Sequence, residues 1–113
     1  MTKNYEQAGN AVTVIAPSGG TTSGVGVLIG SLFGIAATTE EAGADVVLDT
    51  VGMFDHAKTS AQAWTVGALV YFDNTNKVMT TVSTSNKLVG VAVETAANPS
   101  DTGVVRLNGA FIA

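Results

Sequence analysis

The stretch KLVGVAVET, at residues 87–95, decides the fold class of this chain. Apolar residues alternate along it with the two-residue period of a half-buried strand, and valine is a residue that suits a pleated sheet. The alternation assigns one face of the strand to Leu88, Gly90, Ala92 and Glu94, and the other face to Val89, Val91 and Val93. We therefore expect a β-strand here.

The same phrase occurs earlier, as LFGIAAT at residues 32–38. A glycine-led apolar segment precedes each copy, GVGVLIG at residues 24–30 and GALVYFD at residues 67–73. A polar loop and a second strand follow each copy, and we align Leu48-Asp49 of the first with Leu107-Asn108 of the second. Two copies are fewer than a solenoid needs, so the pattern predicts one closed β domain with a pseudo-duplicated strand-loop-strand unit.

The composition describes one domain with an unusually neutral surface. The 113 residues are 46% hydrophobic, yet only 6% are aromatic and 12% charged, about half the usual charged share. Such a surface is poorly defended against association, which favours a protein that a partner partly covers. A monomer with scattered small apolar residues explains the composition equally well.

Several classes of partner conflict with the composition. The net charge is −4 and the five lysines and arginines form no cluster, so nucleic-acid binding lacks its phosphate contacts. There is no cysteine, and therefore no disulfide or thiolate zinc site. The polar start MTKNYEQAGN is not a signal peptide, and no apolar run approaches the ~18 residues of a membrane span.

Turn signals at regular spacing predict nine or ten short strands, and so an all-β, antiparallel sandwich or barrel. Residues 1–10 are polar and unpatterned, and we interpret them as a flexible N-terminal arm before a single β domain at residues 11–113. Residues 67–83 indicate a hairpin around the turn formers Asp73, Asn74 and Asn76. Residues 59–66, TSAQAWTV, are the one segment expected to be helical, for one or two turns.

No set of residues in the sequence predicts catalysis, a metal site or a cofactor. His56 is the only histidine, and Asp55 beside it would point to the opposite face of a strand, so we expect a solvated or strand-packed histidine. The acids are dispersed, and a solvated turn explains Glu40-Glu41.

The glycine-rich loop at residues 18–24 matches neither phosphate-binding motif. Gly19 and Gly24 have the spacing of a P-loop, but Val25 and Gly26 stand where Lys and Ser or Thr are needed. A dinucleotide fingerprint also fails, because Ile29 occupies the third glycine position. We expect these glycines to serve turns and close strand packing.

Two features are candidates for contact with a partner. Tyrosine and tryptophan are over-represented in binding hot spots, and Tyr5 lies in the arm. We therefore expect Thr2, Lys3, Asn4 and Tyr5 to bind a partner, with a frayed terminus that has no role as the alternative. Trp64 is a candidate interface residue, with core packing as its alternative.

Stretches along nearly the whole chain resemble, in order, the small phage and prophage proteins that decorate or cement capsids, a family long catalogued as a domain of unknown function. They are the opening AVTVIAPSGG, the block VLIGSLFGIAAT, the hairpin GALVYFDNTNKVMTTV with its Tyr71-Phe72-Asp73 triplet, and the final blocks KLVGVAVETAA and VVRLNG. The resemblance implies a structural virion protein without catalytic residues, made in the host bacterial cytoplasm, that binds the outside of an assembled capsid.

The physical argument agrees with that implication. A clamp that bridges neighbouring major capsid protein subunits opposes the outward pressure of packed DNA. Many weak copies suffice, because tethering to a lattice raises their effective concentration. The resemblance also implies self-association, and we favour a trimer over a dimer. No nucleic acid, membrane or small-molecule substrate is expected as a partner.

Two other classes of function stay open. A carbohydrate-binding β module would need an exposed aromatic platform, for which Trp64, Tyr71 and Phe72 are the candidates. A hydrolase would need acids that converge from distant strands in a deep pocket, for which Asp55 and Asp73 are the candidates.

Overall fold

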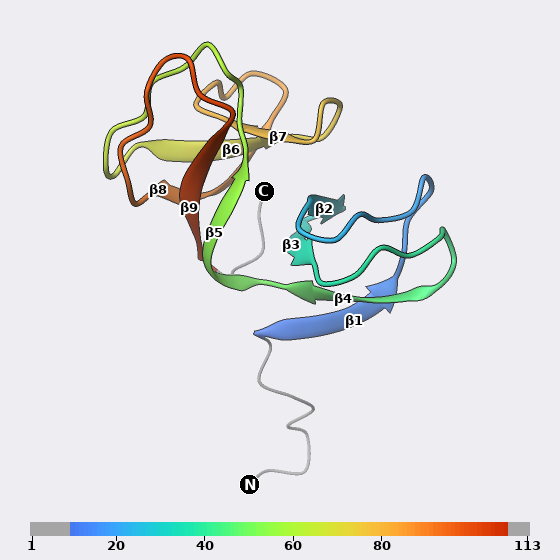
Figure 1. The fold of residues 1–113 in the computed structure, drawn as a ribbon. Coiled ribbons are helices and arrows are strands. Elements are labelled where there is room, and N and C mark those ends of the chain that lie inside the picture. Colours follow the sequence, from blue (N-terminus) through green and yellow to red (C-terminus); the bar gives the residue numbers. More distant parts are fainter. Residues whose placement is uncertain (1–9, 109–113) are drawn as a thin grey trace, which may run out of the picture.

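The chain folds into nine strands, and we describe residues 10–108 of a computed structural model (Figure 1). There is no helix among these residues. The strands are β1 (Ala11–Ile15), β2 (Gly26–Ile29), β3 (Leu32–Ala36), β4 (Asp45–Asp49), β5 (Val51–Ala57), β6 (Leu69–Asp73), β7 (Val78–Thr80), β8 (Lys87–Ala92) and β9 (Thr102–Asn108). The predicted all-β class is confirmed.

The strands form two antiparallel sheets that meet where β4 runs into β5. Sheet A has the order β1-β4-β3-β2, and sheet B has the order β5-β9-β8-β6-β7. A single residue, Thr50, carries the chain from one sheet to the other, so the two sheets form adjacent lobes in Figure 1. The expected arm falls almost entirely on residues 1–9, outside the described residues, and the division into arm and domain stays a prediction.

Both sheets contain the same four-strand unit, which confirms the predicted duplication. In sheet A, β2, β3 and β4 lie side by side in succession, and β1 lies beside β4; in sheet B, β6, β8, β9 and β5 repeat this arrangement. Each unit is a Greek key. The duplication is larger than the sequence indicated, because β1 and β5 belong to it, while β7 is an addition to the second unit.

The registers of the two units agree residue by residue. Gly34 pairs with Val27 as Gly90 pairs with Val70. A Cβ on Gly34 would meet Leu48 and the Asp49 carbonyl, and one on Gly90 would meet Val105 and the Arg106 carbonyl. Two backbone hydrogen bonds repeat as well. Gly24 N–H donates to Ala36 O in the first unit, as Gly67 N–H donates to Ala92 O in the second. Likewise, Ala37 N–H donates to Val47 O, as Val93 N–H donates to Val104 O. The two glycines are therefore structurally equivalent.

The sequence alignment of Leu48-Asp49 with Leu107-Asn108 is wrong by two residues. Leu48 lies opposite Ala36, and the residue opposite Ala92 is Val105. Equivalent residues of the two units are defined by strand register, which hydrogen bonding and side-chain packing set. The sequence similarity between Leu48-Asp49 and Leu107-Asn108 is coincidental.

Two hydrophobic clusters form the core, and β3 contributes to both. Phe33 and Ile35 belong to the larger cluster, which lies between β3 and sheet B, together with Trp64, Val70, Phe72, Met79, Val89, Ala92, Val105 and Leu107. Ala36 and Leu32 face the smaller cluster, with Ala16, Val27, Val46 and Leu48. Because both faces of β3 are covered, this strand holds the two lobes together.

The alternation of buried and exposed side chains predicted for residues 87–95 does not hold along the whole strand, because a β-bulge at Val89 interrupts it. Val70 pairs with Gly90 and the next residue of β6, Tyr71, pairs with Leu88, which leaves Val89 as an extra residue. A bulge shifts the alternation by one residue. Val89 and Ala92 are consequently both buried, although the sequence placed them on opposite faces, and Leu88 is exposed.

The helix expected at residues 59–66 is absent, because this segment is organised by a buried lysine. The Lys58 ammonium donates hydrogen bonds to the carbonyls of Thr59 (2.8 Å) and Gln62 (2.5 Å) on the segment, and of Ser100 (3.2 Å) on a second loop. The backbone of Trp64 is tied to Ala96 by hydrogen bonds in both directions. These bonds hold the segment as turns and a single bridge.

Candidate interaction surface

His56 links the two sheets. Its ring is buried, and Nε2 accepts a hydrogen bond from the Gly26 N–H on β2 at 3.0 Å. The proton of the neutral ring therefore lies on Nδ1, which donates to the Ala57 carbonyl at 2.8 Å. Burial lowers the pKa of His56, because the cation would lose its hydration. The sequence left a solvated or a strand-packed histidine open, and the structure shows the strand-packed one.

The acids proposed for a hydrolase lie at different places. Asp55 lines an open hollow of about 310 Å³ with Glu94, and that hollow does not include Asp73. Asp73 accepts hydrogen bonds from the Asn76 side chain and from the Thr75 and Asn76 amides, and these bonds lower its pKa. Its role is to fix the β6–β7 turn, as predicted. Residues 10–108 contain no group of three metal-binding side chains.

The three aromatics proposed as a sugar platform do not form one. Trp64 is 1% exposed and Phe72 is fully buried, while Tyr71 is half-buried. The Trp64 ring lies so close to Gly103 that a Cβ there would be 2.4 Å from it. The assignment of Trp64 to an interface stays a prediction. Because its ring is buried, Trp64 would contribute to an interface indirectly, by holding the loop around it in place.

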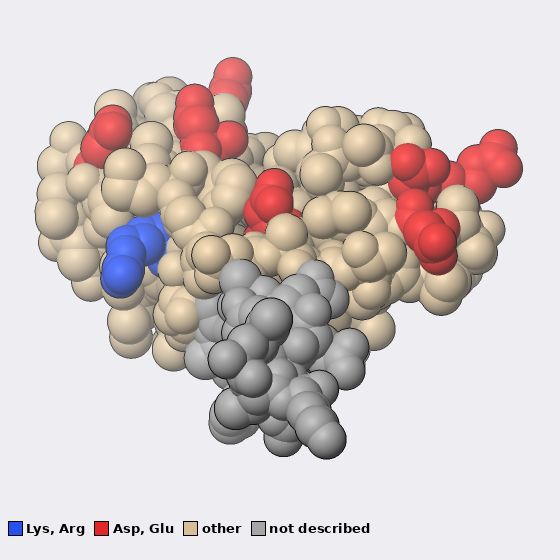
Figure 2. Space-filling model, turned by 90° about the horizontal axis from the view of Figure 1, so that it is seen from below, with Lys and Arg blue, Asp and Glu red and all other residues tan. Residues whose placement is uncertain are grey.

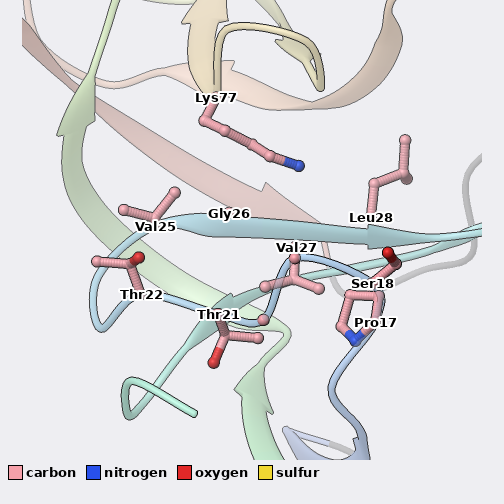
Figure 3. Close-up of a pocket in the computed structure, with 11 residues that line it drawn as sticks. Pro17, Ser18, Thr21, Thr22, Val25, Gly26, Val27, Leu28 and Lys77 are labelled. Carbon is pink, nitrogen blue, oxygen red and sulfur yellow. The ribbon is translucent and has the colours of Figure 1, made fainter. Parts of the chain in front are cut away.

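The glycine-rich loop at residues 18–24 lines a small cavity of about 170 Å³ beside Lys77 (Figure 3). The loop uses its own amides in turns and strand contacts: Gly20 N–H donates to Pro17 O, and Gly24 N–H donates to Ala36 O. Both glycines have positive φ, which suits their turn positions. This agrees with the structural role predicted for them.

The most exposed apolar side chains of sheet B lie on its outer face. Met53, Leu69, Leu88 and Val91, together with Arg106, form what we call the apolar strip. Met53 is 64% exposed and Leu69 is 51% exposed. Leu69, Leu88, Val91 and Arg106 line a hollow of about 130 Å³ with Gly90 and Asn108. An apolar hollow beside one cation is a natural place for a partner side chain.

Charge is distributed unevenly over the surface. Figure 2 shows acidic side chains gathered at the far end of the sheet A lobe, and more of them along one edge of the sheet B lobe. The basic side chains of this view lie over sheet B. Because Lys58 is buried, the accessible cations of the described residues are Lys77, Lys87 and Arg106.

The family model for phage cement proteins matches residues 6–107 of the 113-residue chain. The chain belongs to the phage cement protein family. No curated protein and no solved structure matches it. The resemblance drawn from the sequence is confirmed. The family name indicates a capsid-stabilising, structural protein of the virion.

No helix in residues 10–108 is long and apolar enough to cross a membrane. Membership of a structural family suggests a protein that is not an enzyme.

Sequence reasoning missed two features of this cement protein, the buried Lys58 and the apolar strip. A lysine usually lies at the surface, and no pattern in the sequence marks Lys58 as an exception. The apolar residues of the strip are indistinguishable by letter from those of the core. Only the register Met53–Arg106–Val91–Leu69 across four strands brings them together.

Proposed function

We propose that this cement protein binds the outer surface of an assembled phage capsid and stabilises it by bridging neighbouring subunits of the major capsid protein. The family match over residues 6–107 carries the proposal. The protein would be made in the host cytoplasm and would join the capsid exterior. We also propose that it self-associates, as a trimer rather than a dimer.

The described residues support such a clamp in two ways. The two lobes are joined by a shared strand, β3, and by the hydrogen bond from Gly26 to His56, so load can pass between them. Large apolar side chains remain exposed, among them Val66 and those of the apolar strip. Apolar surface buried at each copy, multiplied over a lattice, gives strong attachment from weak contacts.

Co-sedimentation tests the proposal directly. Capsids that lack the protein are mixed with it and pelleted, and the bound amount is measured against protein concentration. We expect saturable binding to intact capsids, and release on mild denaturation before the capsid protein unfolds. Unassembled capsid subunits are the matched control, because a bridging clamp requires neighbours. Protein that stays in the supernatant at saturating concentration contradicts the proposal.

We further propose that Thr2, Lys3, Asn4 and Tyr5 contact a partner during attachment. Truncation of a hot-spot tyrosine often reduces binding by ~2 kcal/mol, which is about thirtyfold. We expect Tyr5→Ala to weaken capsid binding by this order, and Tyr5→Phe to weaken it less, with the thermal midpoint of the free protein unchanged in both. Equal binding by Tyr5→Ala and wild type would remove the arm from the account.

A further inference from the structure

The apolar strip is the counterpart, in the second unit, of a surface that is covered in the first. The row Ala11–Asp49–Ile35–Gly26 crosses sheet A, and the row Met53–Arg106–Val91–Leu69 crosses sheet B at the equivalent positions. In sheet A, Ile35 is buried in the larger cluster and a Cβ on Gly26 would lie 2.7 Å from the Phe72 ring. The β3 and β2 end of the first row is therefore packed against the other lobe.

The second row has no such cover among the described residues. Met53 and Leu69 are more than half exposed, and a hollow of about 130 Å³ lies beside Leu69, Leu88 and Arg106. The covered row accommodates a large apolar side chain, the Phe72 ring, at the position equivalent to Leu69. In sheet B, Leu69 fills the position that Gly26 leaves open, and the hollow of about 130 Å³ beside it has room for an apolar side chain of another molecule, with a carboxylate placed to meet Arg106.

The chain itself carries that combination on sheet A, on the same face as the first row but at the exposed end of β1 and β4. Ile15 is 58% exposed and pairs directly across the strands with Asp45, which is also exposed. Val47, on the same face, is exposed as well. Directly paired residues on neighbouring strands have side chains about 5 Å apart. Ile15 and Asp45 thus present an apolar side chain next to a carboxylate.

We propose that the apolar strip of one copy binds the Ile15–Asp45 face of a second copy, with Ile15 entering the hollow and Asp45 pairing with Arg106. The two surfaces differ, so the contact is head-to-tail, and a closed ring results if the rotation between copies closes. The distribution of charge favours this occupant, because the far end of the sheet A lobe is acidic and the basic side chains of the same view lie over sheet B, apart from the acids along one edge of that lobe (Figure 2). Capsid binding is not needed for this contact.

Sedimentation velocity over a concentration series of the full chain tests the contact. Leu69→Glu and Ile15→Glu each place a carboxylate in the apolar interface, and we expect each to weaken self-association at least tenfold. Val82→Glu alters an exposed valine outside both surfaces and serves as the matched control, which should associate like wild type. Circular dichroism of each variant checks that the fold is kept.

A charge swap makes the test specific to the pairing. An exposed ion pair contributes little, so Arg106→Glu or Asp45→Lys alone should weaken association roughly threefold to tenfold. The double variant R106E/D45K restores opposite charges between identical copies and should recover most of the wild-type affinity. Failure of the double variant to recover overturns the pairing.

Two further outcomes separate this inference from the proposed function. If Leu69→Glu leaves self-association intact but abolishes co-sedimentation with capsids, the strip is covered by capsid protein and the inference is wrong. If wild type self-associates as expected but never binds capsids, the contact between copies stands and the capsid function fails.

Discussion

Replacing Lys58 by methionine should destabilise the protein strongly, although lysine is ordinarily a surface residue. The side chain is 4% exposed, and its ammonium donates to carbonyls at 2.8, 2.5 and 3.2 Å, with a fourth, Ser60 O, at 3.5 Å. It also lies 5.9 Å from the centre of the Trp64 ring. Methionine fills a similar volume but donates nothing, so the carbonyls lose their donor.

The expected loss of stability follows from these contacts. A hydrogen bond from a charged donor contributes ~1.5–3 kcal/mol net, so three well-made bonds give about 5–9 kcal/mol at most. Part of this is offset, because methionine no longer needs the desolvation of an ammonium and the loops can admit water to the carbonyls. We therefore expect about 3 kcal/mol of lost unfolding free energy, or a thermal midpoint lower by about 10 °C.

Urea unfolding followed by tryptophan fluorescence measures this loss at the buried Trp64 itself. Lys87→Met, at the start of β8, removes the same charge from a half-buried site and should change stability by less than ~0.5 kcal/mol. If Lys58→Met unfolds within about 1 kcal/mol of wild type, as calculated from its urea midpoint, the hydrogen bonds from Lys58 to these carbonyls do not organise residues 59–66.

Four other substitutions test the fold, the link between the lobes and the hollow beside Asp55. Because burial lowers the pKa of His56, the unfolded state binds more protons than the folded state below the ordinary pKa of histidine, ~6.5. The free energy of unfolding should therefore be full above that pH and should fall as the pH drops, by up to ~1.4 kcal/mol per pH unit. Urea midpoints measured from pH 7.5 to 4.5 should show this fall for wild type, and His56→Gln should flatten it. Gly90→Ala should destabilise by more than ~3 kcal/mol, since its Cβ would overlap the Arg106 carbonyl; near-native urea stability of this variant would contradict the close strand approach. Gly34→Ala, with a looser contact to Leu48, should be milder, and a reversed order would argue against the register. Asp55→Asn should leave capsid binding unchanged in co-sedimentation, and a loss with the fold kept would reveal a site at the hollow beside Glu94.

The sequence was most informative where a local pattern and its long-range consequence agree. The repeated LFGIA and LVGVA phrases correctly placed Gly34 and Gly90 in equivalent strands, because a glycine is needed wherever the neighbouring backbone comes this close. The turn chemistry of Asp73 and Asn76 likewise located the β6–β7 hairpin.

What the sequence did not predict depends on contacts between distant residues. The bulge at Val89 comes from the register between β6 and β8, and no letter in KLVGVAVET marks it. Lys58 donates to carbonyls on two loops, and one of its acceptors, Ser100, is 42 residues away in the sequence. The apolar strip exists only because β5, β9, β8 and β6 lie in that order. Composition had indicated a surface poorly defended against association, without locating it.

The stabilisation of DNA-filled capsids tests the central claim most directly. Capsids lacking the protein are heated with and without a saturating amount of it, and DNA release is followed with an intercalating dye. A protein that bridges neighbouring subunits should raise the midpoint of DNA release, in proportion to occupancy and up to saturation of the lattice. A midpoint that stays the same while co-sedimentation shows the capsids to be fully occupied would contradict a cementing role.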